Sequence, residues 1–147
     1  MYTLPRTFLI FTALIIPLSV LPHYAHSYCI YNKMEDDTRF YIRQIGGQRG
    51  TVFSHFRRDK LFPGEEACCP YTKKQCAKEQ TPDSEMTFWM SHAQGNYRDL
   101  VGFEITCPAG GYIIFNRSYL HPKFEVYNAD HTPYEFRLEH RYHNSFN

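Results

Sequence analysis

The stretch MTFWMSH at residues 86–92 alternates large apolar side chains with smaller or polar ones, apart from Trp89. In an extended chain, Met86, Phe88 and Met90 point to one side, and Thr87 and Trp89 point to the other. A period of two is typical of a strand that packs one face on a core and turns the other toward water. The stretch therefore predicts a β-strand with Trp89 on its solvent face.

The same period recurs on both sides of this stretch. RFYIRQI at 39–45, VGFEITC at 101–107 and PYEFRLEHRY at 133–142 all alternate, and no window of a dozen residues has the spacing of an amphipathic helix. Glycine- and proline-rich turn sequences separate the runs. We therefore expect strands at 28–32, 39–45, 51–56, 66–69, 86–92, 100–107, 111–116, 123–128 and 134–142.

This arrangement of strands predicts an all-β fold: an antiparallel β-sandwich of about eight to nine short strands. The segment at 70–85, PYTKKQCAKEQTPDSE, is polar and rich in turn residues. We expect a long surface loop there.

Residues 1–27 are typical of a secretory signal. Arg6 is their only charged residue, and it precedes the apolar run at 7–21, which Pro17 interrupts. A membrane span needs about 20 apolar residues, so a stable transmembrane segment is not expected. A cut after Ser27 places Ala25 and Ser27 at the two positions where signal peptidase prefers small residues. The predicted organisation is a signal peptide at 1–27 and a single, secreted, extracellular β-sandwich domain at 28–147.

The balance of charge excludes one class of partner. Removal of Arg6 from the sixteen basic residues leaves fifteen, equal to the fifteen acidic residues. A neutral, mixed chain lacks the basic surface that nucleic acid requires. The expected partner is an extracellular protein or glycan.

Five cysteines in an oxidising compartment predict a disulfide framework with one thiol left over. These are Cys29, Cys68, Cys69, Cys76 and Cys107. We expect a short loop closed by Cys76 with Cys68 or Cys69, and a longer bridge from Cys29 or Cys107. The spacing does not match structural zinc sites.

The chain has 12 Tyr, 12 Phe and one Trp. Aromatic side chains suit strands, so most of them are expected in the core or at its margins. Trp89, Tyr41 and Tyr127 are expected to face outward, where they would stack on sugar rings or contact a partner surface.

Catalytic and metal motifs are absent from the sequence, and we assign no catalytic residue, metal ligand or cofactor. One alternative remains open at the signal cleavage site. A cut after Ala25 would leave His26 first, as in histidine-brace copper proteins, with a second ligand from His55, His92, His121, His131, His140 or His143. His140 and His143 could also form a metal pair, but residues three apart on a strand point to opposite faces, so we expect a strand end there. We expect the acidic segments at 32–37 and 128–130 to be solvated turns.

Asn116-Arg117-Ser118 is an acceptor sequence for N-glycosylation. It follows the apolar run YIIF at 112–115, so we expect a turn at the end of a strand and a possible glycan on Asn116.

YCIYN at 28–32, RFYIRQ at 39–44, PGEEACCPYTKKQC at 63–76 and CPAGGYIIF at 107–115 together resemble small secreted proteins of early-diverging fungi. The resemblance covers residues 29–142 and implies secretion without implying an activity. In size and strand number the chain also resembles aegerolysin-like sandwich toxins and lectins, but none of their diagnostic residues is present.

The sequence thus favours a secreted, non-enzymatic binding or effector-like protein. Its expected contact surfaces are the loop at 70–85 and outward aromatic residues such as Trp89. The alternatives are a membrane-active aegerolysin-like sandwich and, if cleavage follows Ala25, a histidine-brace copper protein.

Overall fold

The computed structural model of this chain describes residues 26–47, 55–98 and 101–142, and within them it contains strands and no α-helix. The strands are β1 (Ser27–Met34), β2 (Arg39–Gly46), β3 (Arg57–Leu61), β4 (Glu66–Pro70), β5 (Glu85–Gln94), β6 (Tyr97–Arg98), β7 (Val101–Pro108), β8 (Tyr112–Ser118), β9 (His121–Tyr127) and β10 (Leu138–Tyr142).

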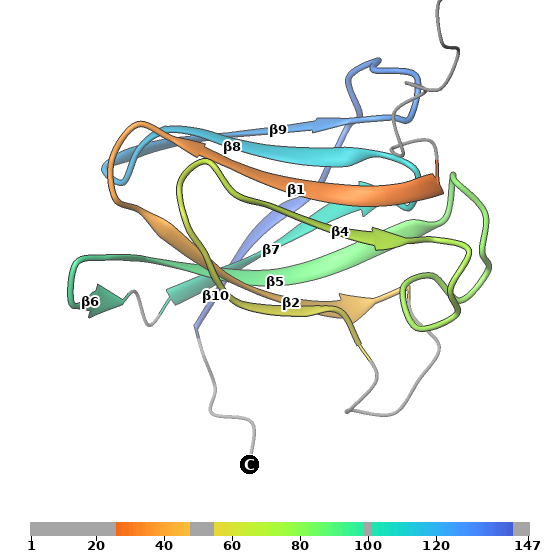
Figure 1. Cartoon of the computed structure of the whole chain (residues 1–147), viewed down its shortest axis with the longest axis horizontal. Coiled ribbons are helices and arrows are strands. Elements are labelled where there is room, and N and C mark those ends of the chain that lie inside the picture. The colour runs from red at the N-terminus through yellow and green to blue at the C-terminus, as the bar shows by residue number, and fades with distance from the viewer. Residues whose placement is uncertain (1–25, 48–54, 99–100, 143–147) are drawn as a thin grey trace, which may run out of the picture.

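The strands form two sheets that lie one above the other (Figure 1). The first sheet has the order β4-β1-β8-β9, and the second has the order β10-β7-β5-β2-β3, with β6 paired to β5. This confirms the disulfide-bonded all-β sandwich. Every pairing between named strands is antiparallel except that of β1 with β8, which is parallel.

Aromatic pairs join strands of the two layers, and the following three have the shortest distances between ring centroids among those described. Phe40 of β2 stacks on Phe115 of β8 with ring centroids 4.1 Å apart. Tyr28 of β1 meets Phe88 of β5 at 5.1 Å, and Phe103 of β7 meets Phe124 of β9 at 4.8 Å. Such pairs add to the free energy gained from burying the rings, and they fix how the two sheets face each other.

Alternation correctly predicted the faces of the central strands. Met86, Phe88 and Met90 are fully buried, whereas Trp89 is half-buried on the opposite face of β5. Phe103, Ile105 and Cys107 of β7 are also buried. The core therefore lies on one face of the second sheet, and the other face of that sheet is available for a site.

Three details differ from the expected strands. The strand expected at 51–56 falls mostly outside the described residues, and His55 and Phe56 are not part of a strand. The neighbouring strand is β3, whose first four residues are charged and exposed. The strand expected at 134–142 begins only at Leu138. Residues 134–137 form no strand ladder, although Tyr134 and Phe136 pack against the core.

Candidate functional site

The outer face of the second sheet brings together two of the three aromatic residues that the sequence singled out. Tyr41 and Arg43 lie two positions apart on β2 and therefore share a face. Arg43 is the direct cross-strand partner of Trp89 on β5, and Tyr41 is the partner of Ser91. Tyr41 and Trp89 are consequently diagonal neighbours, at a spacing that large side chains bridge.

These residues border an open depression of about 420 Å³ on this face. Its floor and rim come from three strands, β2, β3 and β5, which are adjacent in the sheet. The lining residues are Tyr41, Ile42, Arg43, Arg57, Arg58, Asp59 and Trp89.

Gly102 positions the indole of Trp89. A Cβ atom at Gly102 would lie 2.4 Å from the Cε2 and Nε1 atoms of Trp89, so the ring occupies the space that any larger residue would fill. Gly102 lies on β7, the strand next to β5. The indole thus crosses toward the neighbouring strand and covers the glycine, an arrangement in which an aromatic ring shields a bare stretch of backbone.

The depression is basic. Its lining includes three arginines and one aspartate. Arg58 pairs in the register with Ile42, which is buried on the inner face, so Arg43 and Arg57 are the arginines that share a face with Trp89. Arg57 Nε lies 2.6 Å from Asp59 Oδ1, and Arg58 lies 3.4 Å from Glu65, but the side chains of both pairs are largely exposed. Exposed ion pairs contribute little to stability, about 0–1 kcal/mol, so an incoming anion can compete for these guanidinium groups.

Two aromatic faces beside guanidinium groups define what this surface can bind. Tyr and Trp rings offer flat apolar faces with a polar edge, which suit sugar rings. A guanidinium presents parallel N–H donors that match the two oxygens of a carboxylate or sulfate. The residues that line the depression do not include a nucleophile with an adjacent base.

Tyr127 lies elsewhere, on the outer face of the first sheet. Its ring stacks on Tyr112 of β8 at 5.0 Å with an angle of 21° between the planes. Tyr112 in turn meets Tyr31 edge-on at 6.0 Å, and its hydroxyl lies 3.0 Å from Nδ1 of His131. The structure therefore separates Tyr127 from Tyr41 and Trp89 by the thickness of the sandwich.

The cysteines form two disulfides and leave one buried thiol. Cys29 of β1 bonds to Cys68 of β4, and Cys69 bonds to Cys76 in the following loop. The pairing of Cys76 with Cys69 is one of the two that the sequence left open. Cys107 is fully buried, and burial raises the pKa of its thiol well above the ordinary value. A buried, protonated thiol is a poor nucleophile, so Cys107 is a core residue.

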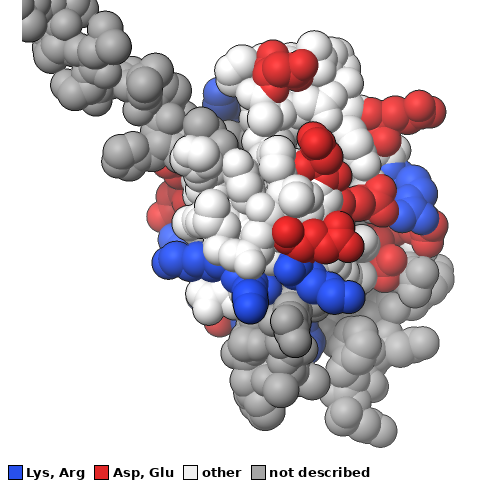
Figure 2. All heavy atoms as spheres, turned by 90° about the vertical axis from the view of Figure 1, so that its right-hand side faces the viewer, with Lys and Arg blue, Asp and Glu red and all other residues white. Residues whose placement is uncertain are grey.

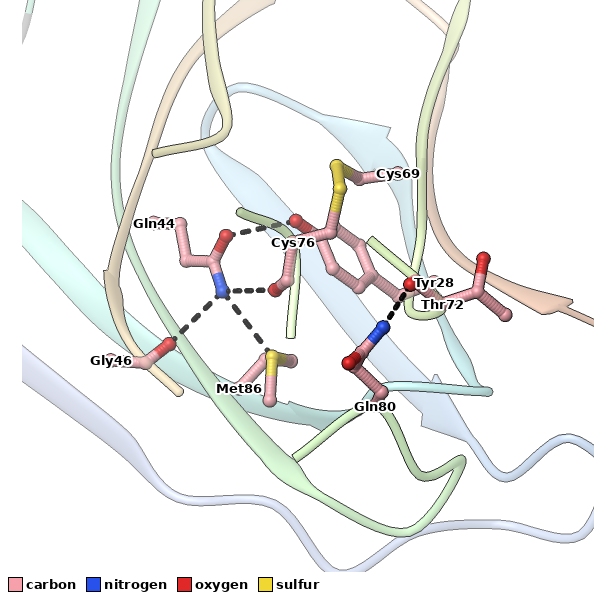
Figure 3. Close-up of a disulfide and its surroundings, with 8 residues drawn as sticks. All are labelled: Tyr28, Gln44, Gly46, Cys69, Thr72, Cys76, Gln80 and Met86. Atoms are coloured by element: carbon pink, nitrogen blue, oxygen red, sulfur yellow. Dashed lines mark hydrogen bonds between the residues drawn. A yellow bond between two sulfur atoms is a disulfide. The ribbon is translucent and has the colours of Figure 1, made fainter. Parts of the chain in front are cut away.

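A buried glutamine ties the disulfide loop to the second sheet (Figure 3). Gln44 Nε2 donates hydrogen bonds to the carbonyl oxygens of Cys76, at 2.7 Å, and Gly46, at 3.1 Å, and it also lies 3.2 Å from the sulfur of Met86. Gln44 Oε1 accepts a hydrogen bond from the hydroxyl of Tyr28 at 2.9 Å. Burial, with a smaller contribution from Cys107, raises the pKa of Tyr28, which keeps this hydroxyl a donor.

The loop between β4 and β5 runs from residue 71 to residue 84, as expected from its composition. It has buried anchors at Tyr71, Cys76 and Ala77, and Lys78 N donates to Gly47 O at 2.8 Å. Figure 2 faces the end of the sandwich that carries this loop, and it shows acidic and basic side chains next to one another on this face. This end therefore presents no extended field of one sign.

His26 and Ser27, which the sequence assigns to the signal peptide, make contacts with the fold. Ser27 pairs with Pro70, and His26 O accepts a hydrogen bond from Tyr71 N at 3.0 Å. His26 Nδ1 also lies 3.1 Å from the hydroxyl of Tyr71. A chain that begins at Tyr28 lacks these contacts, and one that begins at His26 keeps them.

Asn116 lies inside β8 rather than in a turn beyond its end. Its Nδ2 atom donates to Glu125 Oε2 at 2.7 Å across to β9, and the strand continues to Ser118 before the chain turns at Tyr119 and Leu120. Glycosylation of Asn116 remains a prediction, and a glycan there would replace one of the two hydrogens on the Nδ2 atom that makes this bond.

The described residues contain no group of three or more His, Cys, Asp and Glu side chains placed to hold a metal ion. The acidic turns have structural partners instead. Asp36 accepts hydrogen bonds from the backbone N–H groups of Thr38 and Tyr119, and Asp130 accepts from Thr132. His143, the second member of the sequence pair with His140, lies outside the described residues.

Within the part of the chain that the structure describes, no helix has the length and apolar character to cross a membrane. Among the described residues, the most exposed large apolar side chains belong to four different segments: Ile45, Phe62, Leu120 and Leu138.

Comparison of the chain with family models, with curated proteins and with solved structures found no match in any of the three.

Proposed function

We propose that this chain is a secreted, disulfide-bonded binding protein that recognises a saccharide through the outer face of its second sheet. The observation that supports the proposal is the depression in which Tyr41 and Trp89 lie beside Arg43 and Arg57. Aromatic rings stack on the apolar faces of sugars, and the paired N–H donors of arginine bind the acidic groups that some sugars carry. The rigid sheet supplies both at fixed spacing.

The fold supports the proposed location. Two disulfides form stably in an oxidising environment such as the extracellular space. Intact mass measurement of the secreted protein tests the location and the cleavage site together. A first residue of Tyr28 agrees with removal of residues 1–27 and excludes the copper site that needs an N-terminal His26.

A glycan array probed with the secreted protein tests saccharide binding. The array should include 3′-sialyllactose with lactose, an aldouronic acid with its xylo-oligosaccharide, and tetragalacturonate. We expect at least one saccharide to bind wild-type protein and Tyr127→Ala, which changes the opposite sheet, but not Trp89→Ala. Absence of binding to every saccharide, or equal binding by Trp89→Ala, would refute the proposed function.

A further inference from the structure

We propose that the ligand is an oligosaccharide in which an acidic sugar is joined to uncharged sugars, rather than a neutral glycan or a uniformly charged polymer. This rests on the proposed function and adds the chemical class of the ligand. It follows from the order of charges across the sheet.

One outward residue from each of five strands forms a row across the second sheet. The register pairs Arg57 of β3 with Arg43 of β2, and Arg43 with Trp89 of β5. It then pairs Trp89 with Glu104 of β7, and Glu104 with Glu139 of β10. Neighbouring strands are about 4.8 Å apart, so the row extends about 19 Å from the basic end to the acidic end.

The basic end fits an acidic sugar. Arg43 and Arg57 are adjacent in the register and both line the depression beside Trp89. A carboxylate placed over β2 and β3 meets parallel N–H donors while the sugar ring that carries it stacks on an aromatic face.

The acidic end lies on the other side of Trp89, where a second depression opens on the same face. It is lined by Thr87, Glu104, Thr106, Arg137 and Glu139, so it has two carboxylates and one guanidinium. Carboxylates and threonine hydroxyls accept hydrogen bonds from the hydroxyls of a sugar. The same carboxylates repel a second anion, so a chain with an acid on every sugar is disfavoured where it passes Glu104 and Glu139.

The test compares the matched pairs of the array in solution. Because Trp89 is the only tryptophan of the chain, its fluorescence reports directly on this face. Lactose is 3′-sialyllactose without its acidic sugar, and the xylo-oligosaccharide is the aldouronic acid without its acidic sugar. In the pair that binds, we expect the member without the acidic sugar to bind at least tenfold more weakly. We expect tetragalacturonate to bind more weakly than the acidic member of that pair.

Charge-neutral variants separate the two ends of the row. Arg43→Gln should abolish the preference for the acidic sugar, and Glu104→Gln should strengthen binding of tetragalacturonate. Lys123→Gln, on β9 of the opposite sheet, is the control and should change neither.

Equal affinity for the two members of the pair, or tightest binding of tetragalacturonate to the wild type, would overturn the inference while leaving saccharide binding intact. Failure of every saccharide to bind would instead overturn the proposed function on which the inference rests.

Discussion

Gly102 and Trp89 form the smallest unit on which the site depends. The indole fills the space above the glycine, and it lies between the basic and the acidic parts of the row. The sequence predicts an outward Trp89 because that residue alternates with buried Met and Phe. It does not show that Arg43 and Glu104 flank it, because cross-strand register depends on how strands align and not on the pattern within one strand.

Replacement of Gly102 by alanine should move the indole and weaken ligand binding. The new Cβ would lie 2.4 Å from ring atoms of Trp89, so the ring must shift away. We expect a changed emission maximum of Trp89, affinity lowered about tenfold or more, and a loss of about 1–3 kcal/mol in the free energy of unfolding.

Gly95→Ala is the control. Its Cβ meets open space, but its φ of 55° is unfavourable for alanine, so stability should fall by about 1 kcal/mol without a change in Trp89 emission. An unchanged emission spectrum in Gly102→Ala would show that the ring does not depend on the glycine.

Asp36 should contribute to stability in a pH-dependent way. Desolvation opposes its ionisation, but hydrogen bonds from Thr38 and from the backbone of Tyr119 outweigh it and lower the pKa of the carboxyl group. A pKa that is lower in the folded state gives stabilisation that is present above the unfolded pKa of about 3.9 and is lost as pH falls through the folded pKa.

The matching variant is Asp36→Asn, which keeps one acceptor and loses the other. It should lower the free energy of unfolding at pH 7 by about 1 kcal/mol, measured in urea, and make stability fall less steeply below pH 4. Asp83→Asn changes an exposed loop residue and serves as the control. If the stability of Asp36→Asn falls as steeply below pH 4 as that of the wild type, other carboxyl groups cause the loss of stability in acid.

At the scale of elements, the loop at 71–84 is held at defined points although its sequence looks like a freely variable surface segment. Cys69–Cys76 fixes it to β4, and Gln44 fixes it to β2. Because the glutamine is buried, removal of its side chain takes a hydrogen bond from the hydroxyl of Tyr28 and from the carbonyl of Cys76 in the interior of the protein.

Gln44→Leu should therefore destabilise the protein by about 2–4 kcal/mol, since the hydroxyl of Tyr28 and the carbonyl of Cys76 both lose a buried partner. Urea unfolding measures the change. Gln80→Ala is the matched control, because Gln80 also donates to a loop carbonyl, that of Thr72, but is exposed. Its effect should stay within about 0.5 kcal/mol. Equal stability of Gln44→Leu and the wild type would mean that the hydrogen bonds of Gln44 do not anchor the loop.

The strands that the sequence predicts well and those it misses differ in their surroundings. β5 and β7 each have one buried and one outward face, so their side chains alternate and the strands can be recognised. β3 is an edge strand with four charged, exposed residues in succession, and charge on an edge discourages pairing with other chains but leaves no alternation. Residues 134–137 alternate because Tyr134 and Phe136 pack on the core, yet they form no strand ladder. The pattern reports burial, and burial does not require pairing.

At the scale of the whole molecule, the two sheets share one hydrophobic core that includes aromatic residues from both. The aromatic pairs between the layers, together with Gln44 and the disulfide loop, connect the sheets at several points. The outer face that carries Trp89 therefore cannot lose its strand register without exposing the inner face of the same strands. The proposed binding surface should be as stable as the core beneath it.

This coupling predicts that probes on opposite faces of the second sheet report one unfolding transition. Trp89 is half-buried on the outer face of β5, and Cys107 is buried on the inner face of β7, its direct neighbour in the sheet. Between about pH 7 and 8, iodoacetamide should leave Cys107 unmodified in the native protein, because burial both excludes the reagent and raises the pKa of the thiol. With rising urea, alkylation of Cys107 and the emission of Trp89 should change with the same midpoint, as they do when a protein unfolds as a single unit. Cys107→Ala, unlabelled at every urea concentration, controls for reaction at the disulfide cysteines. Separate midpoints would show that the outer face rearranges while the core stays closed, and they would contradict a single cooperative domain.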